Sequence, residues 1–194
     1  MTDRRRCIVV DVESTGLEVQ HQATEVAWYD LSTDEYGVFI PPHSLEGADP
    51  FALQIHGYAE RIAGMPVDDG TEQRLLHDRF GSGRNRSTII CANPSFDTEK
   101  VSALFARSGL TPTDPWHHRK INVSEGAYWL FPDQFPDGEQ PGLKAVADLL
   151  GVPLPGHHSA LDDVMATVEV YRRLERLRGT VQISGLLDLM AVPA

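Results

Sequence analysis

The sequence has very little cysteine and no hydrophobic run long enough to cross a membrane. None of its apolar runs approaches the ~20 residues that a transmembrane helix needs. Its 194 residues include only two cysteines, Cys7 and Cys91, and each lies inside an apolar, strand-like run. No CxxC pair and no Cys/His pair at zinc-binding spacing is present. This pattern favours two buried free thiols over a disulfide or a metal site.

The N-terminal residues do not show the pattern expected of a secretory signal peptide. The first residues, MTDRRRCIVVDVE, carry basic side chains, but only a short apolar run follows before the first acid. A signal peptide needs a longer apolar segment and a cleavage site of small residues. We therefore expect a cytoplasmic protein that does not associate with a membrane.

Positive charge is scarce. Lysine and arginine total 17 against 28 acidic residues, which gives a formal net charge of −11 at pH 7. Such a balance argues against a protein that coats duplex nucleic acid through a broad basic surface. It is compatible with an enzyme that handles a short single-stranded end in one groove, with part of the acidic excess placed where cations bind.

Strand and helix patterns along the chain predict one α/β domain with a mixed sheet. The first three strands should form an antiparallel meander. The predicted strands are residues 6–13, 23–31, 35–42, 87–93 and 119–123. The predicted helices are residues 48–57, 72–80, 94–108, 124–131, 142–151 and 160–179. Residues 180–194 form a tail with at most one short helix.

Two carboxylates, Asp11 and Glu13, follow an unbroken apolar run in CIVVDVESTGL at residues 7–17. Side chains alternate along a strand, so positions 11 and 13 face the same way just before STG ends the strand. If unpaired, two like charges there would repel each other, and one would take up a proton. The pair is well placed to hold a divalent cation. Capping of the next turn or pairing with an arginine would also account for it.

Asp97 lies in the first turn of the helix predicted over residues 94–108, for which Asn93 is the expected N-cap. Helical spacing aligns Asp97 with the apolar residues Val101 and Phe105, so its carboxylate should point toward the core. The plain alternative is a first-turn acid that stabilises the helix N-terminus.

The third acidic position is Asp163, near the start of the helix predicted over residues 160–179. Asp163 interrupts the apolar stripe of this helix, whereas Asp162 lies on the polar side. His158 precedes the helix in a loop. A loop histidine beside an inward carboxylate is a candidate general base.

Four inward acids on three separate elements are costly to bury unless something neutralises them. A pair of divalent cations is the economical answer, because two metals ~3.5–4 Å apart can serve the in-line displacement of a phosphodiester. Ligands that are all oxygen atoms favour magnesium or manganese over zinc.

Three motifs together resemble those of the DEDDh 3′–5′ exonucleases. They are D-x-E-x-T-G-L at 11–17, N-x-x-F-D at 93–97 and H-x-A-x-x-D at 158–163, and their order and spacing fit. That family includes the proofreading epsilon subunit of bacterial DNA polymerase III, RNase T and oligoribonuclease. The resemblance covers residues 5–178 and implies an exonuclease domain over residues 1–179, with a C-terminal tail over 180–194. The implied fold is RNase H-like: a mixed five-stranded sheet flanked by helices.

The resemblance also implies roles for single residues. Two divalent cations, Mg²⁺ or Mn²⁺, would be held by Asp11, Glu13, Asp97 and Asp163, and His158 would deprotonate the attacking water. The implied substrate-binding residues are Ser14, Thr15, Gly16, Leu17, His56, Asn93 and Phe96. The expected substrate is the 3′ end of a single-stranded nucleic acid, with DNA favoured, and the expected product is a nucleoside 5′-monophosphate. A DNA polymerase or a second copy of the chain is a possible partner.

Two departures from the family pattern leave the proposed ligands untouched. Ser14 stands where the family more often has threonine, and Asn122-Val123 stands where an Asp-Thr pair is common. His157 beside His158 offers a second register, but Ala160 and Asp163 fit the motif only with His158.

Three other readings compete with an exonuclease. A haloacid dehalogenase-type phosphatase needs a second aspartate where this chain has Glu13, and it leaves His158 without a role. A non-catalytic nucleic-acid or polymerase-docking module of the same fold has no need of the full acid set. An interaction protein with acids as mere surface charge conflicts with the inward helical positions of Asp97 and Asp163.

Overall fold

The computed structural model describes residues 5–135, 138–155 and 158–190, with side chains up to residue 178. His157, the alternative histidine of the third motif, lies outside the described residues. None of the described helices combines the length and the apolar character that a membrane crossing requires.

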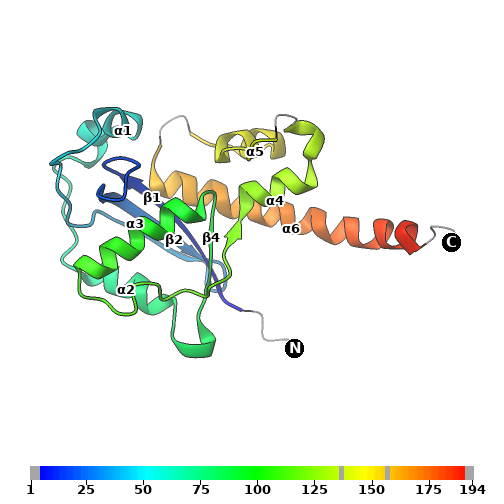
Figure 1. The fold of residues 1–194 in the computed structure, drawn as a ribbon, viewed down its shortest axis with the longest axis horizontal. Helices are drawn as coiled ribbons and strands as arrows, with labels where there is room; N and C mark the ends of the chain where they lie inside the picture. The colour runs from blue at the N-terminus through cyan, green and yellow to red at the C-terminus, as the bar shows by residue number, and fades with distance from the viewer. Residues whose placement is uncertain (1–4, 136–137, 156–157, 191–194) are drawn as a thin grey trace.

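A mixed sheet with the strand order β3-β2-β1-β4-β5 forms the centre of the molecule (Figure 1). Strand β1 pairs antiparallel with β2 and parallel with β4, while β2–β3 is antiparallel and β4–β5 is parallel. The predicted five-stranded mixed sheet is therefore confirmed. The strands are β1 Cys7–Ser14, β2 Ala23–Asp30, β3 Glu35–Phe39, β4 Thr88–Cys91 and β5 Ile121–Asn122.

Six α-helices and three short helical turns are described around the sheet. The α-helices are α1 Pro50–Ile55, α2 Thr71–Arg79, α3 Pro94–Arg107, α4 Val123–Leu130, α5 Leu143–Leu150 and α6 Ala160–Met190. The short turns are η1 Tyr58–Ile62, η2 Gly83–Asn85 and η3 Pro132–Gln134.

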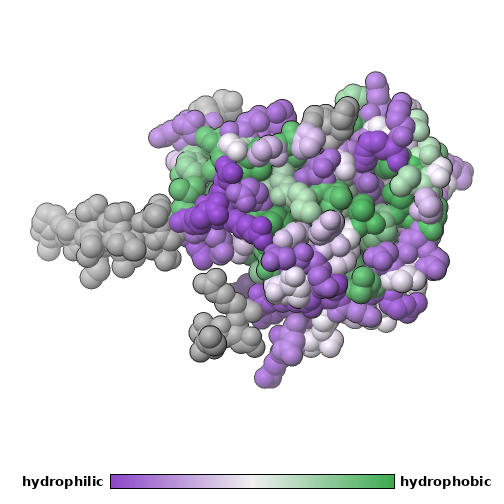
Figure 2. Space-filling model, turned by 180° about the vertical axis from the view of Figure 1, so that it is seen from behind, coloured by the Kyte–Doolittle hydropathy of each residue, from purple (hydrophilic) through white to green (hydrophobic). Residues whose placement is uncertain are grey.

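The sheet separates two apolar cores. Ile8, Val10 and Val12 of β1 pack with residues of α2 and α3, whereas Val9 packs with residues of α4, α5 and α6. Because side chains alternate along β1, Asp11 and Glu13 share the face of Val9 and point to the side of α6. On the far side of the molecule, apolar and hydrophilic residues lie interspersed in small groups (Figure 2).

Several boundaries differ from the sequence-based prediction. Helix α6 continues through Gly179 to Met190, where we expected a break and a separate tail. A single glycine costs a helix only about 1 kcal/mol, so it does not stop one by itself. Strand β3 ends at Phe39 rather than at Pro42, because prolines cannot donate to a sheet ladder. Strand β5 is reduced to two residues, because Asn122 caps α4 by accepting from the amide of Glu125.

Candidate active site

The candidate site begins where β1 extends beyond the end of its parallel neighbour β4. Strand β1 pairs with β4 only through Cys7, Ile8 and Val9, and then continues alone on that side to Ser14. Asp11 and Glu13 lie on this extension and are partly exposed. Within the described residues, neither carboxylate has an ion-pair or hydrogen-bond partner. The end of the central strand β1 therefore presents two acids that lack a direct ion-pair partner in the described part of the chain.

Asp97 fills the gap that the short β4 leaves beside β1. It lies in the first turn of α3 and is only 3% exposed. Its carboxylate takes hydrogen bonds from the backbone amides of Val12 and Asn93 and from the thiol of Cys91. Asp97 thus accepts from the Val12 amide, which lies on the side of β1 that β4 no longer covers. This interaction ties α3 to the strand that carries Asp11 and Glu13.

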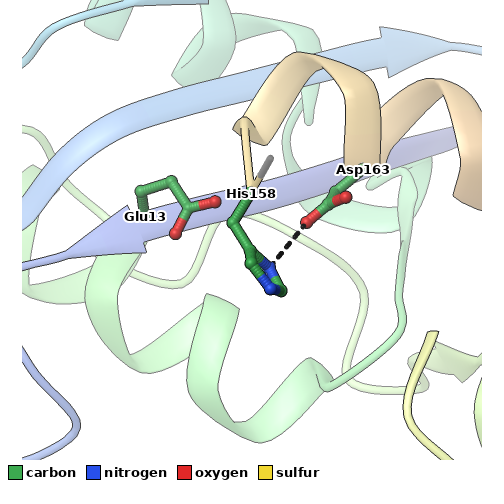
Figure 3. A group of neighbouring side chains, drawn as sticks. All are labelled: Glu13, His158 and Asp163. Carbon is green, nitrogen blue, oxygen red and sulfur yellow. Dashed lines mark ion pairs between the residues drawn. The ribbon is translucent and has the colours of Figure 1, made fainter. Parts of the chain in front are cut away.

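Glu13, His158 and Asp163 form a close group at the start of α6. One potential ligand atom from each lies within 4.8 Å of the other two. The His158 Nδ1 is 3.8 Å from Oδ2 of Asp163, and the carboxylates of Glu13 and Asp163 approach the imidazole from two sides (Figure 3). The His158 side chain is 60% exposed, whereas that of Asp163 is 13% exposed. A largely buried carboxylate therefore lies beside a histidine that water can reach.

Burial, and after it mutual repulsion, raises the pKa values of the four acids. Burial raises the pKa of Asp97 to about 8, although its three hydrogen bonds oppose the rise. Burial and the charges of Asp163 and Glu25 raise the pKa of Glu13 to about 7. Burial raises the pKa of Asp163 to about 6, with His158 acting in the opposite direction. Burial, followed by Asp97 and Asp163, raises the pKa of Asp11 well above its usual range.

A fifth acid, Glu25, supports the site and was not among the predicted residues. It lies opposite Glu13 in the β1–β2 ladder and is 8% exposed. Its Oε2 accepts from both terminal nitrogens of Arg61, at 3.2 and 2.8 Å, and from the amide of Ala160 at 3.0 Å. Glu25 thus joins η1 to the first residue of α6, the helix that carries Asp163.

A signal for Glu25 existed in the sequence, since an acid inside the buried strand ATEVAWYD is as unusual as Asp11 and Glu13. Its partners could not be found, because Arg61 and Ala160 are distant in sequence. Arg61 is also a cation that lowers the pKa of both Glu13 and Asp163.

The predicted substrate loop follows β1 directly and is internally braced. The hydroxyl of Ser14 lies 2.6 Å from the carbonyl oxygen of Gly16. The hydroxyl of Thr15 accepts from the amide of Gln22, and its carbonyl accepts from the amide of Asp49. The Leu17 side chain is 76% exposed. The loop therefore has a rigid base and an apolar tip in solvent.

Gly16 has no room for a side chain. Its φ of +151° is a conformation that L-residues rarely adopt, and a Cβ there would lie 2.4 Å from the ring of His21. His21 in turn accepts from the amide of Glu18 and contacts the carbonyl oxygen of Gly47 through Nε2. His21 thus supports the loop, and sequence reasoning did not identify it.

The remaining three predicted substrate residues have different surroundings. His56 is 2% exposed, and its Nε2 lies 3.1 Å from the carbonyl oxygen of Ser14, so it supports the loop from beneath. Phe96 is partly exposed on the first turn of α3. Asn93 is exposed at the N-cap of α3, but its side chain makes no capping hydrogen bond, contrary to our expectation.

Comparison with known proteins places this chain in a family. A model of the RNase T-type exonuclease family matches residues 8–171. A search of curated protein sequences finds no match.

Solved structures of nucleases share the fold. Exonuclease I from Methylocaldum szegediense superposes with a TM-score of 0.69 at 21% identity, over 90% of this chain and 41% of that one. E. coli Exonuclease I in complex with a dT13 oligonucleotide superposes with a TM-score of 0.63 at 20% identity, over 92% of this chain and 43% of that one. The nuclease domain of 3′hExo, a DEDDh family member bound to rAMP, superposes with a TM-score of 0.65 at 14% identity, over 92% of this chain and 94% of that one.

The chain spans less than half the length of the two Exonuclease I chains but nearly all of the 3′hExo nuclease domain. The family match covers most of this chain, including the strand of Asp11, the helix of Asp97 and the first turns of α6. The chain belongs to the exonuclease family that the RNase T model describes.

Proposed function

We propose that this protein is a divalent-metal-dependent 3′–5′ exonuclease that removes nucleoside 5′-monophosphates from single-stranded ends. The observation that carries the proposal is the grouping of Glu13, His158 and Asp163 within 4.8 Å, beside the uncompensated Asp11 and the buried Asp97. An acid set of this kind has little use in a purely structural module, because each member raises the cost of the others.

The donor set fits hard divalent cations. Asp11, Glu13, Asp97 and Asp163 offer only carboxylate oxygens, which Mg²⁺ and Mn²⁺ prefer. The repulsion that raises their pKa values would be relieved by positive charge at the same place. We propose that the four acids hold two such cations, which when bound would activate water and stabilise the leaving oxygen.

His158 is the proposed general base. Its Nδ1 faces Asp163 at 3.8 Å, which leaves Nε2 for the attacking water. Asp163 would stabilise the imidazolium that forms when the proton arrives. The exposure of the ring allows the proton to pass on to solvent after each cycle.

The proposed strand terminus lies between the loop that follows β1 and the start of α3. Ser14, Thr15 and Gly16 would face the sugar and phosphate, while Leu17 and Phe96 would contact the base. Asn93 would stand at the rim, and His56 would act through the backbone of Ser14. The dT13 complex of E. coli Exonuclease I supports DNA as the favoured substrate, while rAMP on 3′hExo keeps RNA as the alternative.

Two neighbouring aspartates on α6 give a matched test of the mechanism. Asp163→Asn should abolish digestion, because it removes a proposed metal ligand and the partner of His158. Asp162→Asn should stay within about two-fold of wild type, because Asp162 is outside the ligand group. The measurement is Mn²⁺-dependent digestion of 3′- and 5′-labelled DNA and RNA oligonucleotides. Digestion from the 5′ end, or an active Asp163→Asn variant, would contradict the proposal.

The raised acid pKa values predict a stability that falls with pH when metal is removed. Between pH 4 and 8 the folded protein holds protons on Asp97 that the unfolded chain has released, so stability is lost as pH rises through this window. In EDTA, wild type should therefore lose more stability than Asp97→Asn between pH 5 and pH 8. The free energy of unfolding of the variant minus that of wild type should increase over this range. We expect a rise of more than about 1.4 kcal/mol, the equivalent of one pKa unit.

Chemical denaturation at the two pH values measures this difference. The lowered pKa of buried His56 acts in the opposite direction, but it is common to both variants and cancels. Mn²⁺ at pH 8 should stabilise wild type far more than Asp97→Asn. An equal response of the two proteins to pH and to Mn²⁺ would refute a metal site at Asp97.

Glu25 should matter for rate although it does not belong to the proposed ligand set. Glu25→Ala removes the acceptor of both Arg61 and the Ala160 amide, so the first turn of α6 loses its anchor. We expect a loss of about 10–100-fold in kcat/KM, typical of residues that orient metal ligands. Glu25→Gln should lose less, because its amide oxygen still accepts. Glu169→Gln breaks an ion pair farther along α6 and should have no effect; equal activity of all four proteins would disprove this role.

A further inference from the structure

Lys100 is a fully buried cation that none of the roles described so far requires. It lies on α3 one turn beyond Asp97 and is 0% exposed. A buried ammonium group is expensive unless each of its three N–H donors finds an acceptor. The acceptors around its ammonium group therefore indicate the role of Lys100.

The acceptors of Lys100 lie mainly in the substrate loop. Its Nζ is 2.6 Å from the carbonyl oxygen of Glu18 and 3.4 Å from that of Leu17. The third acceptor is Oε1 of Glu99 at 3.0 Å, which belongs to a half-exposed side chain. The same Nζ lies 5.4 Å from the centre of the Phe96 ring. One ammonium group thus contacts both segments that are proposed to meet the terminal base.

The tip of the loop is held by Lys100 together with His21, whose backbone amide donates to the carbonyl oxygen of Glu18 at 2.9 Å. Thr15 is fixed by Gln22 and Asp49, and Gly16 is packed against His21. The Leu17 side chain, in contrast, is 76% exposed and gains little from packing. Its position is set by the backbone, and the carbonyl of Leu17 is held by Lys100.

We propose that Lys100 is a positioning residue, which fixes the exposed Leu17 beside Phe96 as an apolar clamp for the base of the terminal nucleotide. The inference rests on the proposed exonuclease function and adds a determinant of substrate affinity to it. Lys100 is buried beneath the loop and does not itself touch the strand. Its loss should weaken the hold on the base and leave the reaction at the phosphate intact.

The test compares two oligodeoxythymidylates that differ only at the 3′-terminal residue. One carries thymine there, and the other has an abasic residue. In Lys100→Met, KM for the complete oligonucleotide should rise about ten-fold, as expected when one base-stacking contact is lost. The KM for the abasic oligonucleotide, and kcat for both, should stay within about two-fold of wild type. The preference of the wild type for a terminal base should therefore disappear.

Two further variants separate positioning from mere support of the fold. Glu99→Gln removes the negative charge of the half-exposed partner of Lys100 and keeps the loop contacts, so it should behave as wild type. Leu17→Ala should raise KM for the complete oligonucleotide in wild type but add little in Lys100→Met, because both changes disable the same clamp.

Each failure has a distinct meaning. Unchanged KM in Lys100→Met, or an equal loss on both oligonucleotides, would overturn the positioning role. If Lys100→Met folds poorly, Lys100→Gln takes its place in the same comparison. Full additivity of its effect with that of Leu17→Ala would also overturn the role. If wild type digests neither oligonucleotide with Mn²⁺ or Mg²⁺, the proposed function itself is wrong, and the role of Lys100 falls with it.

Discussion

Electrostatic repulsion among acids at one end of β1 is the constraint around which the rest of the molecule is arranged. Asp11 and Glu13 leave the apolar core on a strand whose parallel neighbour has already ended. Asp97 and Asp163 approach from the first turns of two helices, where amide groups and the helix dipole favour negative charge. Arg61 adds positive charge nearby. These contributions reduce the repulsion without removing it, so that the pKa values of all four acids stay raised.

The positions of the acids depend on a second set of polar contacts that carries no chemistry of its own. Glu25 anchors the start of α6, His56 and His21 brace the loop after β1, and the Val12 amide holds Asp97. These contacts come from the loop after β1, from residues 56–61 and from the first residue of α6. The geometry of the site therefore depends on contacts between separate segments as well as on the sheet.

The sequence predicted the sheet, its helices and the acids of the site because each depends on local patterns. Alternation placed Asp11 and Glu13 on one face, and helical spacing distinguished Asp163 from Asp162. Contacts between distant segments could not be read in this way. The pairing of Glu25 with Arg61 and Ala160, the burial of His56 and the contacts of Lys100 all require knowledge of which loops meet. The extension of α6 past Gly179 was missed because glycine was given too much weight as a helix end.

Strand β1 serves both sides of the sheet, since its even positions from Ile8 to Val12 fill one core and its odd positions carry the acids. This division makes the strand tolerant of substitutions at its apolar positions but intolerant of insertions and deletions. Apolar residues of similar size can replace one another at the even positions over evolutionary time. A single inserted or deleted residue, however, would exchange the two faces and bring charge into the core. Descendants of this protein should therefore vary in composition along β1 while keeping its length.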